Sequence, residues 1–194
     1  MPTRSGRGLF ASELMSRLPC LPVEEEGRLN DAVLRDNFIE RVFAYRRLRS
    51  FFACRWTTGT LVAFHTAHKL QIMAHSPQAY TELGRLVANA KHQPRATLSE
   101  RYAAGLMQAL CLTATRRRHT NVLQHMAGYF KRDLDGVSRQ ELAALIDDYR
   151  SGMVPLIVPI TLIRHYARRF DVAYLNDQIY LQPHPKELML RNHV

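Results

Sequence analysis

Apolar residues recur at three- and four-residue spacing along most of this chain, and this period is the feature that most limits its fold. The clearest stripe consists of Leu142, Leu145, Ile146 and Tyr149. The sequence has no sustained alternation of apolar and polar residues between turn dipeptides, which would indicate strands. It therefore predicts an all-α fold, a single compact domain of about seven to eight helices with an irregular N-terminal arm.

Start and stop signals divide this pattern into separate helices. Ser76 followed by Pro77 combines a capping hydroxyl with a proline at the first helical position. Thr97-Leu-Ser-Glu100 and Ser138-Arg-Gln-Glu141 are capping-box patterns, each predicting a helix that begins there. Gly152 suits the position just after a helix end. The chain should break again near 115–118, where two helices are expected to meet.

These signals predict the following organisation. Residues 1–30 are expected to form an arm or a domain remnant, 31–188 the helical domain and 189–194 a C-terminal tail. The expected helices cover 31–52, the stretch up to 74, 77–91, 97–115, about 118–130, the stretch from Ser138 to Gly152, 160–170 and 172–181.

Nothing in the composition predicts a membrane segment, a disulfide framework or a cofactor. The longest nearly uncharged stretch, 153–163, is too short to span a bilayer. The N-terminus lacks the continuous apolar run of a secretory signal, so the expected location is the cytoplasm. Cys20, Cys54 and Cys111 are far apart and odd in number, which favours unpaired thiols.

The net charge of +10 is concentrated in one part of the sequence. Residues 91–132 carry eight basic residues against Glu100 alone, whereas 133–150 carry five acidic residues against two basic ones. A localised basic surface attracts polyanions, and nucleic acid is the commonest partner of this kind. The alternative is a face that only keeps the protein in solution.

Basic and amide side chains on three expected helices are candidates for contacting nucleic acid. If those helices share a face, the residues would form a cationic cleft that suits phosphates and the hydroxyls and base edges of RNA. Otherwise they are helix caps and ordinary surface charge. The candidates are Lys69, Arg116, Arg117, Arg118, His119, Asn121, Lys131, Arg164 and Arg168.

Nine histidines also raise the hypothesis of a histidine-rich pocket. His65 and His68 have the i, i+3 spacing that can share a metal ion. Glu82 is the only carboxylate between Glu40 and Glu100, so no metal site is predicted, and a structural role is the alternative. The pocket candidates are His65, His68, His75, Tyr80, His125, Tyr129, His165 and Tyr166. Familiar nucleotide-binding, hydrolase and zinc-protease motifs are absent from the sequence, so it does not decide whether the protein is an enzyme.

Three blocks carry a resemblance to a known family: FHTAHKLQIMAHSPQAYTELGRLVA (64–88), RRRHTNVLQHMAGYFK (116–131) and the stretch from VPLIVPITLIRHYARRF to YLNDQIYLQPHP (154–185). Residues 48–188 resemble the YbgA-like family of unknown function. Residues 6–48 resemble the end of a thiouracil desulfurase-family domain, which precedes this module in many bacterial proteins. Such fusions are associated with removing sulfur from thiouridine in tRNA.

The resemblance implies a function but not the catalytic step. The cysteines that hold the iron–sulfur cluster of the desulfidase part lie in a region absent from this sequence, so we do not expect desulfidation by this chain alone. We expect an accessory module that binds nucleic acid, tRNA in particular. The alternatives are an enzyme that uses the histidine-rich pocket, with or without a metal, and a helical adaptor that docks a separate desulfidase or other catalytic subunit through residues 1–50.

Overall fold

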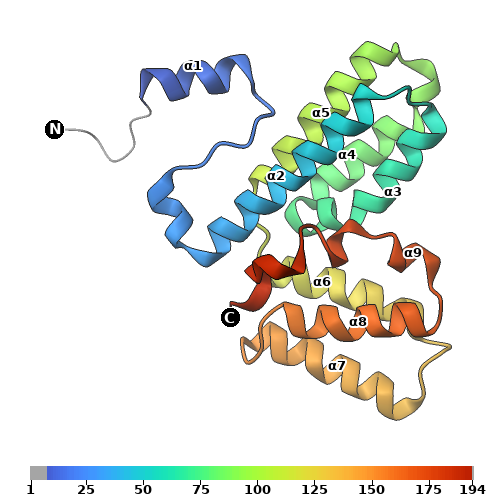
Figure 1. The fold of residues 1–194 in the computed structure, drawn as a ribbon. Coiled ribbons are helices and arrows are strands. Elements are labelled where there is room, and N and C mark those ends of the chain that lie inside the picture. Colours follow the sequence, from blue (N-terminus) through green and yellow to red (C-terminus); the bar gives the residue numbers. More distant parts are fainter. Residues whose placement is uncertain (1–7, 194) are drawn as a thin grey trace.

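The computed structural model describes residues 8–193 and confirms the all-α fold (Figure 1). Short 3₁₀ turns join the helices, and no strand occurs in this range. The α-helices of the described residues number nine, against the expected seven to eight, because one lies in the N-terminal arm. They are α1 Leu9–Arg17, α2 Ala32–Ala53, α3 Thr58–His75, α4 Pro77–Ala88, α5 Arg95–Cys111, α6 Arg116–Ala127, α7 Gly136–Ser151, α8 Ile157–Arg169 and α9 Ala173–Asn176.

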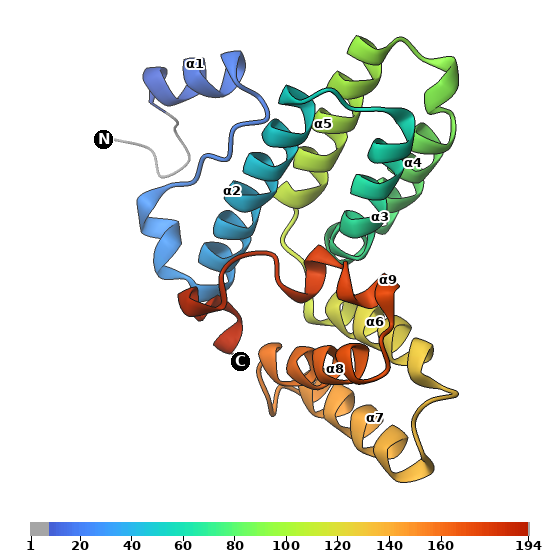
Figure 2. The same ribbon diagram turned by 45° about the vertical axis from the view of Figure 1, so that its right-hand side comes forward.

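The buried hydrophobic residues form two clusters rather than one continuous core. Helices α2 to α5 surround the first cluster, and α6 to α8 with residues 173–181 surround the second (Figures 1 and 2). Helix α3 belongs to both, since Leu61 and Ile72 pack in the first cluster and Leu70 and Ala74 in the second. The two bundles therefore share one helix.

The helix starts confirm one sequence signal and correct two. The Ser76 hydroxyl accepts a hydrogen bond from the Ala79 amide at 3.1 Å, and Pro77 opens α4 as predicted. Helix α5 begins at Arg95, before the expected Thr97, because the extended backbone of Pro94 already marks the boundary. Helix α7 begins at Gly136, before the expected Ser138. There the Asp135 carboxylate caps the helix by accepting from the Ser138 amide at 2.7 Å.

Three other helix boundaries differ from the prediction, and one agrees with it. Helix α8 begins at Ile157 and includes Pro159, since the missing amide of a proline in the first turn leaves no helix bond unmade. Helix α4 ends at Ala88, followed by a 3₁₀ turn, Ala90–His92. The helix expected over 172–181 is divided into α9 and a 3₁₀ turn, Ile179–Leu181. Gly152 ends α7 with φ of 82°, as predicted for this position.

The N-terminal arm is not wholly irregular as expected, because it contains α1. No residue of α1 is buried, and no side chain caps its start. Leu9 and Phe10 are 92% and 82% exposed. Figure 1 shows α1 set apart from both bundles. The contacts of α1 are limited, since only Ala11, Leu14 and Met15 are half-buried.

Helix α2 turns a polar face inward. Val33 and Val42, which belong to its apolar stripe, are exposed, whereas Asp36, Asn37 and Glu40 are buried. Buried charges need partners, so this face points to a polar centre of the molecule.

Among the described helices, none combines the length and the apolar character needed to cross a membrane.

Candidate anion-binding site

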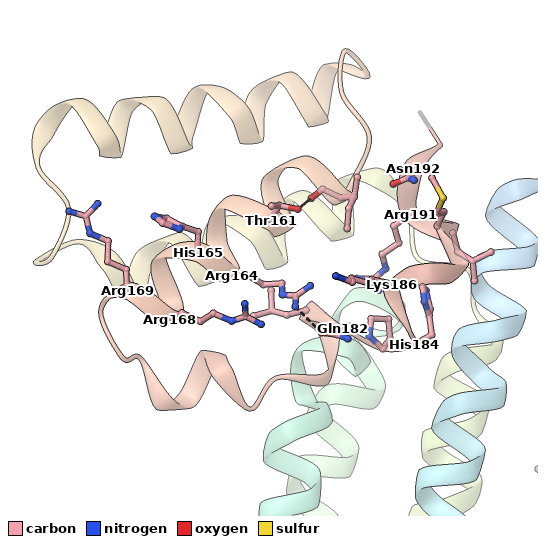
Figure 3. A pocket seen from close by; sticks show the side chains of 15 residues that line it. Thr161, Arg164, His165, Arg168, Arg169, Gln182, His184, Lys186, Arg191 and Asn192 are labelled. Carbon is pink, nitrogen blue, oxygen red and sulfur yellow. Dashed lines mark hydrogen bonds between the residues drawn. The ribbon is translucent and has the colours of Figure 1, made fainter.

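A cavity of about 700 Å³ lies between α8 and the C-terminal segment 181–192 (Figure 3). This volume is in the range of pockets that hold small ligands. Positions 161, 164, 165 and 168 of α8 follow the spacing i, i+3, i+4 and i+7, so one helix face lines the cavity. The lining residues are Ile157, Thr161, Arg164, His165, Arg168, Arg169, Leu181, Gln182, Pro183, His184, Lys186, Met189, Leu190, Arg191 and Asn192.

Five of these residues are cationic, and none is acidic. Arg164 is half-buried and donates to Oε1 of Gln182 at 2.8 Å. Burial and the neighbouring charge of Arg168 lower the pKa of Arg164, a sign that the cations repel one another. None of Arg164, Arg168, Arg169 and Lys186 forms an ion pair with any residue in 8–193. An anion in this cavity would relieve that repulsion.

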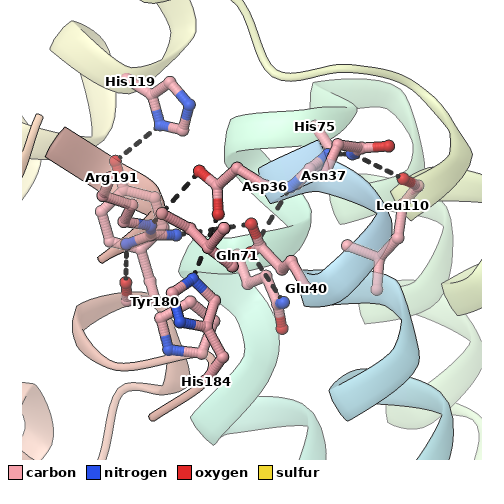
Figure 4. Close-up of polar contacts among 12 residues, drawn as sticks. Asp36, Asn37, Glu40, Gln71, His75, Leu110, His119, Tyr180, His184 and Arg191 are labelled. Atoms are coloured by element: carbon pink, nitrogen blue, oxygen red, sulfur yellow. Dashed lines mark hydrogen bonds and ion pairs between the residues drawn. The ribbon is translucent and has the colours of Figure 1, made fainter. Parts of the chain in front are cut away.

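Arg191, the fifth cation, has a different environment because carboxylates of α2 pair with it (Figure 4). Its Nη2 lies 3.4 Å from Oε2 of Glu40, and its Nε lies 4.0 Å from Oδ2 of Asp36. Its Nη1 donates to the Tyr180 carbonyl at 2.6 Å. Burial alone would lower the pKa of Arg191, but Glu40 and Asp36 raise it above its usual value. Arg191 thus forms the wall between the cavity and a buried polar network.

Glu40 is the centre of that network. Gln71 donates to its Oε1 at 2.8 Å, and Nε2 of His75 lies 3.5 Å from the same oxygen. Burial alone would raise the pKa of Glu40, but the charge of Arg191 and the contacts with His75 and Gln71 outweigh it and hold the pKa below its usual range. Glu40 therefore stays ionised although only 3% of its surface is exposed.

Two histidines extend the network on either side of Arg191. Nε2 of His184 lies 3.1 Å from Oδ1 of Asp36, and its Nδ1 lies 3.1 Å from the Pro185 carbonyl. Both ring nitrogens thus face acceptors. On the other side, Nδ1 of His119 lies 2.8 Å from the Tyr180 hydroxyl. Burial lowers the pKa of His119 to about 3, so its ring is neutral.

A third histidine, His68, fixes the position of the C-terminal segment. Its Nδ1 donates to the Phe64 carbonyl at 2.7 Å, and its Nε2 accepts from Nε of Arg47 at 3.2 Å. Arg47 in turn donates to the Pro183 carbonyl at 2.7 Å. Burial lowers the pKa of His68 to about 4, which suits a neutral ring that accepts from an arginine.

The nucleic-acid candidates from the sequence lie in several places. Arg164 and Arg168 line the cavity together, whereas Lys69 packs over Tyr174 with 4.7 Å between Nζ and the ring centroid. Arg118 donates to the His75 carbonyl at 2.8 Å and thereby joins α6 to the end of α3.

The remaining candidates lie elsewhere on α6 and just after it. Arg116, Arg117 and Asn121 line a shallow hollow with Arg150 on the side of α6, His119 faces Tyr180, and Lys131 is exposed beyond α6. The basic stretch 91–132 does not form one surface, because α5 spans about 25 Å between Arg95 and the start of α6.

The pocket candidates likewise do not share one cavity. Nδ1 of His65 lies 3.2 Å from the Tyr102 hydroxyl, and burial lowers the pKa of His65 to about 4. His75 belongs to the polar network, and His165 lines the cationic cavity. Within residues 8–193, no three His, Cys, Asp or Glu side chains are grouped so that they could hold a metal ion.

The other pocket candidates are aromatic or lie beside aromatic rings. The His125 ring packs against Tyr129, with 5.7 Å between their centroids. Tyr166 is buried against Phe130 in the second cluster, and Tyr80 packs against the first cluster.

Sequence reasoning missed several residues that shape this site. Glu40, His184 and Arg191 were not among the candidates, and Arg191 is buried although it lies in the range expected to be a tail. His184 belongs to the block YLNDQIYLQPHP, so the family motif contained a signal. Asp36 and Glu40 are polar residues one helical turn apart in α2, and this spacing was a second signal of a polar face. The apolar residues of the same helix, such as Val33 and Val42, made it hard to see. Nothing in the sequence distinguished Arg191 from the other arginines.

Comparisons with known proteins identify the family. Residues 69–185 match the family described as "Protein of unknown function (DUF1722)". The chain is 37% identical over 158 residues to the Escherichia coli protein named "Uncharacterized protein YbgA", and the alignment covers 81% of this chain and 94% of the relative. No solved structure matches the chain. Both matches confirm the resemblance to the YbgA-like family, and this chain belongs to that family.

Proposed function

We propose that this chain is an RNA-binding module that holds backbone phosphates in the cationic cavity. The observation that carries the proposal is a cavity lined by five cationic side chains and no carboxylate. Arg164, Arg168 and Lys186 have no ion-pair partner within 8–193, which supports a role for their charge in binding a ligand. Arg169 also forms no ion pair there, but hydrogen bonds from Ser138 and, to a smaller extent, the nearby charge of Arg169 lower the pKa of the Asp135 carboxyl. Phosphate contacts of this kind supply most of the non-specific affinity of proteins for nucleic acid.

Transfer RNA is the first ligand to test. The N-terminal segment resembles the end of a desulfurase-family domain, whose fusions with this module are associated with thiouridine in tRNA. The mixed lining supports a nucleotide chain over a bare inorganic anion, because Ile157, Leu181 and Leu190 offer apolar surface beside the arginines.

Affinity for tRNA measured by fluorescence anisotropy over a series of salt concentrations tests the proposal. We expect the affinity to fall steeply as the salt concentration rises. The double variant Arg164→Gln/Arg168→Gln should bind more weakly. Its slope of log affinity against log salt concentration should be smaller by about one for each phosphate that is no longer bound. The matched control is Arg46→Gln/Arg85→Gln, two exposed arginines on α2 and α4. Binding that is indifferent to salt, or equal weakening in both double variants, would contradict the proposal.

A second candidate function, a docking adaptor, has its own supporting observation. Helix α1 exposes Leu9 and Phe10, and a hollow of about 430 Å³ separates the arm from α2 around Cys20 and Phe52. An exposed apolar helix outside both bundles suits a protein contact. Mixing the chain with a separately produced thiouracil desulfurase-family protein tests it. Co-elution on size exclusion that disappears in Leu9→Ser/Phe10→Ser supports the adaptor, and separate elution of the wild type rejects it.

A further inference from the structure

Two tyrosines from distant parts of the chain are stacked at the surface of the second bundle. Tyr129, in the turn after α6, lies against Tyr174 of α9 with 5.0 Å between ring centroids and 20° between ring planes. Tyr129 is 40% exposed. We call this pair the tyrosine platform, and neither ring lines the anion-binding cavity.

The inner ring of the platform is held firmly. Gln178, which is 3% exposed, donates to the Thr66 carbonyl at 2.9 Å and to the Tyr174 carbonyl at 3.2 Å, so it joins α9 to α3. Lys69 of α3 lies over the Tyr174 ring, and burial raises the pKa of the Tyr174 hydroxyl. A ring fixed in this way loses little conformational freedom when a ligand stacks on its partner.

A lysine and a histidine accompany the exposed ring. Lys131 lies two residues after Tyr129, at most about 7 Å along the chain, and is exposed. His125 packs edge-on against Tyr129, at 76° between the ring planes, and is also exposed. An aromatic surface with a lysine beside it is the arrangement by which proteins bind single-stranded nucleic acid, since each base offers a stacking face and each linkage a phosphate.

We propose that the tyrosine platform stacks an unpaired nucleobase of the bound RNA, with Tyr129 in direct contact and Tyr174 as the ring that supports it. This inference rests on the proposed function and adds a preference for single-stranded segments. The cavity recognises charge, which duplex and single strand share. The platform needs a free base face, which a duplex hides inside its stack.

The test compares a short single-stranded oligoribonucleotide with the duplex of the same sequence by fluorescence anisotropy. We expect Tyr129→Ala to weaken single-strand binding by about tenfold with an unchanged salt slope, and to leave duplex binding as it was. Tyr129→Phe keeps the ring and should bind like the wild type. Equal binding by Tyr129→Ala and wild type, or a loss of affinity in Tyr129→Phe as large as in Tyr129→Ala, would overturn the platform.

A second measurement uses the wild-type protein and does not depend on the folding of a variant. Replacing the bases of the oligonucleotide with abasic sites keeps the phosphates and should weaken wild-type binding by the same factor of about ten. Undiminished binding to the abasic strand overturns the platform while leaving the RNA-binding proposal intact. If the wild type binds no RNA in a salt-dependent manner, the proposed function itself fails, so the two failures are distinguishable.

Discussion

The two polar regions on either side of Arg191 differ in their charge balance. On the α2 side, Asp36 and Glu40 face Arg191, His75 and His184, so each charge has a partner. On the α8 side, Arg164, Arg168 and Lys186 face one another with no carboxylate among them. In the first arrangement the chain itself supplies a partner for each carboxylate, whereas in the second we propose that an anion from outside supplies the missing negative charge. The comparison separates groups that hold the fold from groups that are available for binding.

Removing Arg191 should have the largest effect on the free energy of unfolding. Arg191→Ala leaves Glu40 and Asp36 buried without their main cation, and the loss of one partner of a buried ion pair costs about 3 to 5 kcal/mol. Urea denaturation followed by circular dichroism measures the change. A loss below about 1 kcal/mol would show that water reaches Glu40 and that the network is not a structural centre.

Acid should also destabilise the protein, because burial lowers the pKa of His65, His68 and His119 to about 4, 4 and 3. Histidines of the unfolded chain take up protons below about pH 6.5, whereas these three stay neutral in the fold. The unfolded state then binds more protons, so stability falls as the pH falls, by up to about 1.4 kcal/mol per unit for each histidine. The contribution of Glu40, whose pKa is lowered, disappears only at still lower pH.

Urea denaturation at several pH values between 7 and 5 measures this slope. His68→Asn should flatten it, since Asn retains an amide near the Phe64 carbonyl but does not titrate. His92→Asn is the matched control, because His92 is exposed on a 3₁₀ turn. Equal flattening by the two variants would show that buried histidines do not cause the slope.

Neutralising a cavity cation should change stability much less than removing Arg191. Arg164→Gln takes away one of several charges that repel one another, so we expect a change within about 0.5 kcal/mol. Urea denaturation in low salt measures it. A loss of several kcal/mol would mean that Arg164 stabilises the fold. The α8 side of Arg191 would then not differ from the α2 side in this respect.

The smallest effect should come from an exposed ion pair. Nη2 of Arg150 lies 3.2 Å from Oδ1 of Asp147, and both side chains are more than half exposed. Arg150→Ala should cost less than about 1 kcal/mol, because solvent screens such pairs. Denaturation in parallel with Arg191→Ala gives the ratio of the two losses, and similar losses would contradict the ranking.

The sequence predicted the fold class because helix periodicity and capping are local properties. Ser76, Pro77 and Gly152 act as predicted, since each needs only its near neighbours. Two starts, at Thr97 and Ser138, were wrong by about half a turn, because the signals at Pro94 and Asp135 took effect first. Local sequence signals thus predicted most of the helices correctly but misplaced some of their first residues.

The candidate site was only partly predictable because its residues meet through tertiary packing. Arg164 and Arg168 were found from charge alone, one helical turn apart. Glu40 and Arg191, 151 positions apart, are linked only once the C-terminal segment lies against α2. Apolar periodicity does not reveal the buried face of α2 either, because Val33 and Val42 are exposed there while Asp36 and Glu40 are buried.

Helix α3, which the two hydrophobic clusters share, has a consequence for how the molecule opens. Its amide hydrogens lie between both bundles, so exchange with solvent in its middle requires both to separate. Helix α1 has no fully buried residue and belongs to neither cluster, so it should unwind without opening either bundle. Hydrogen exchange should therefore be slowest in α3 and approach the rate of global unfolding there, so the two bundles open as one cooperative unit.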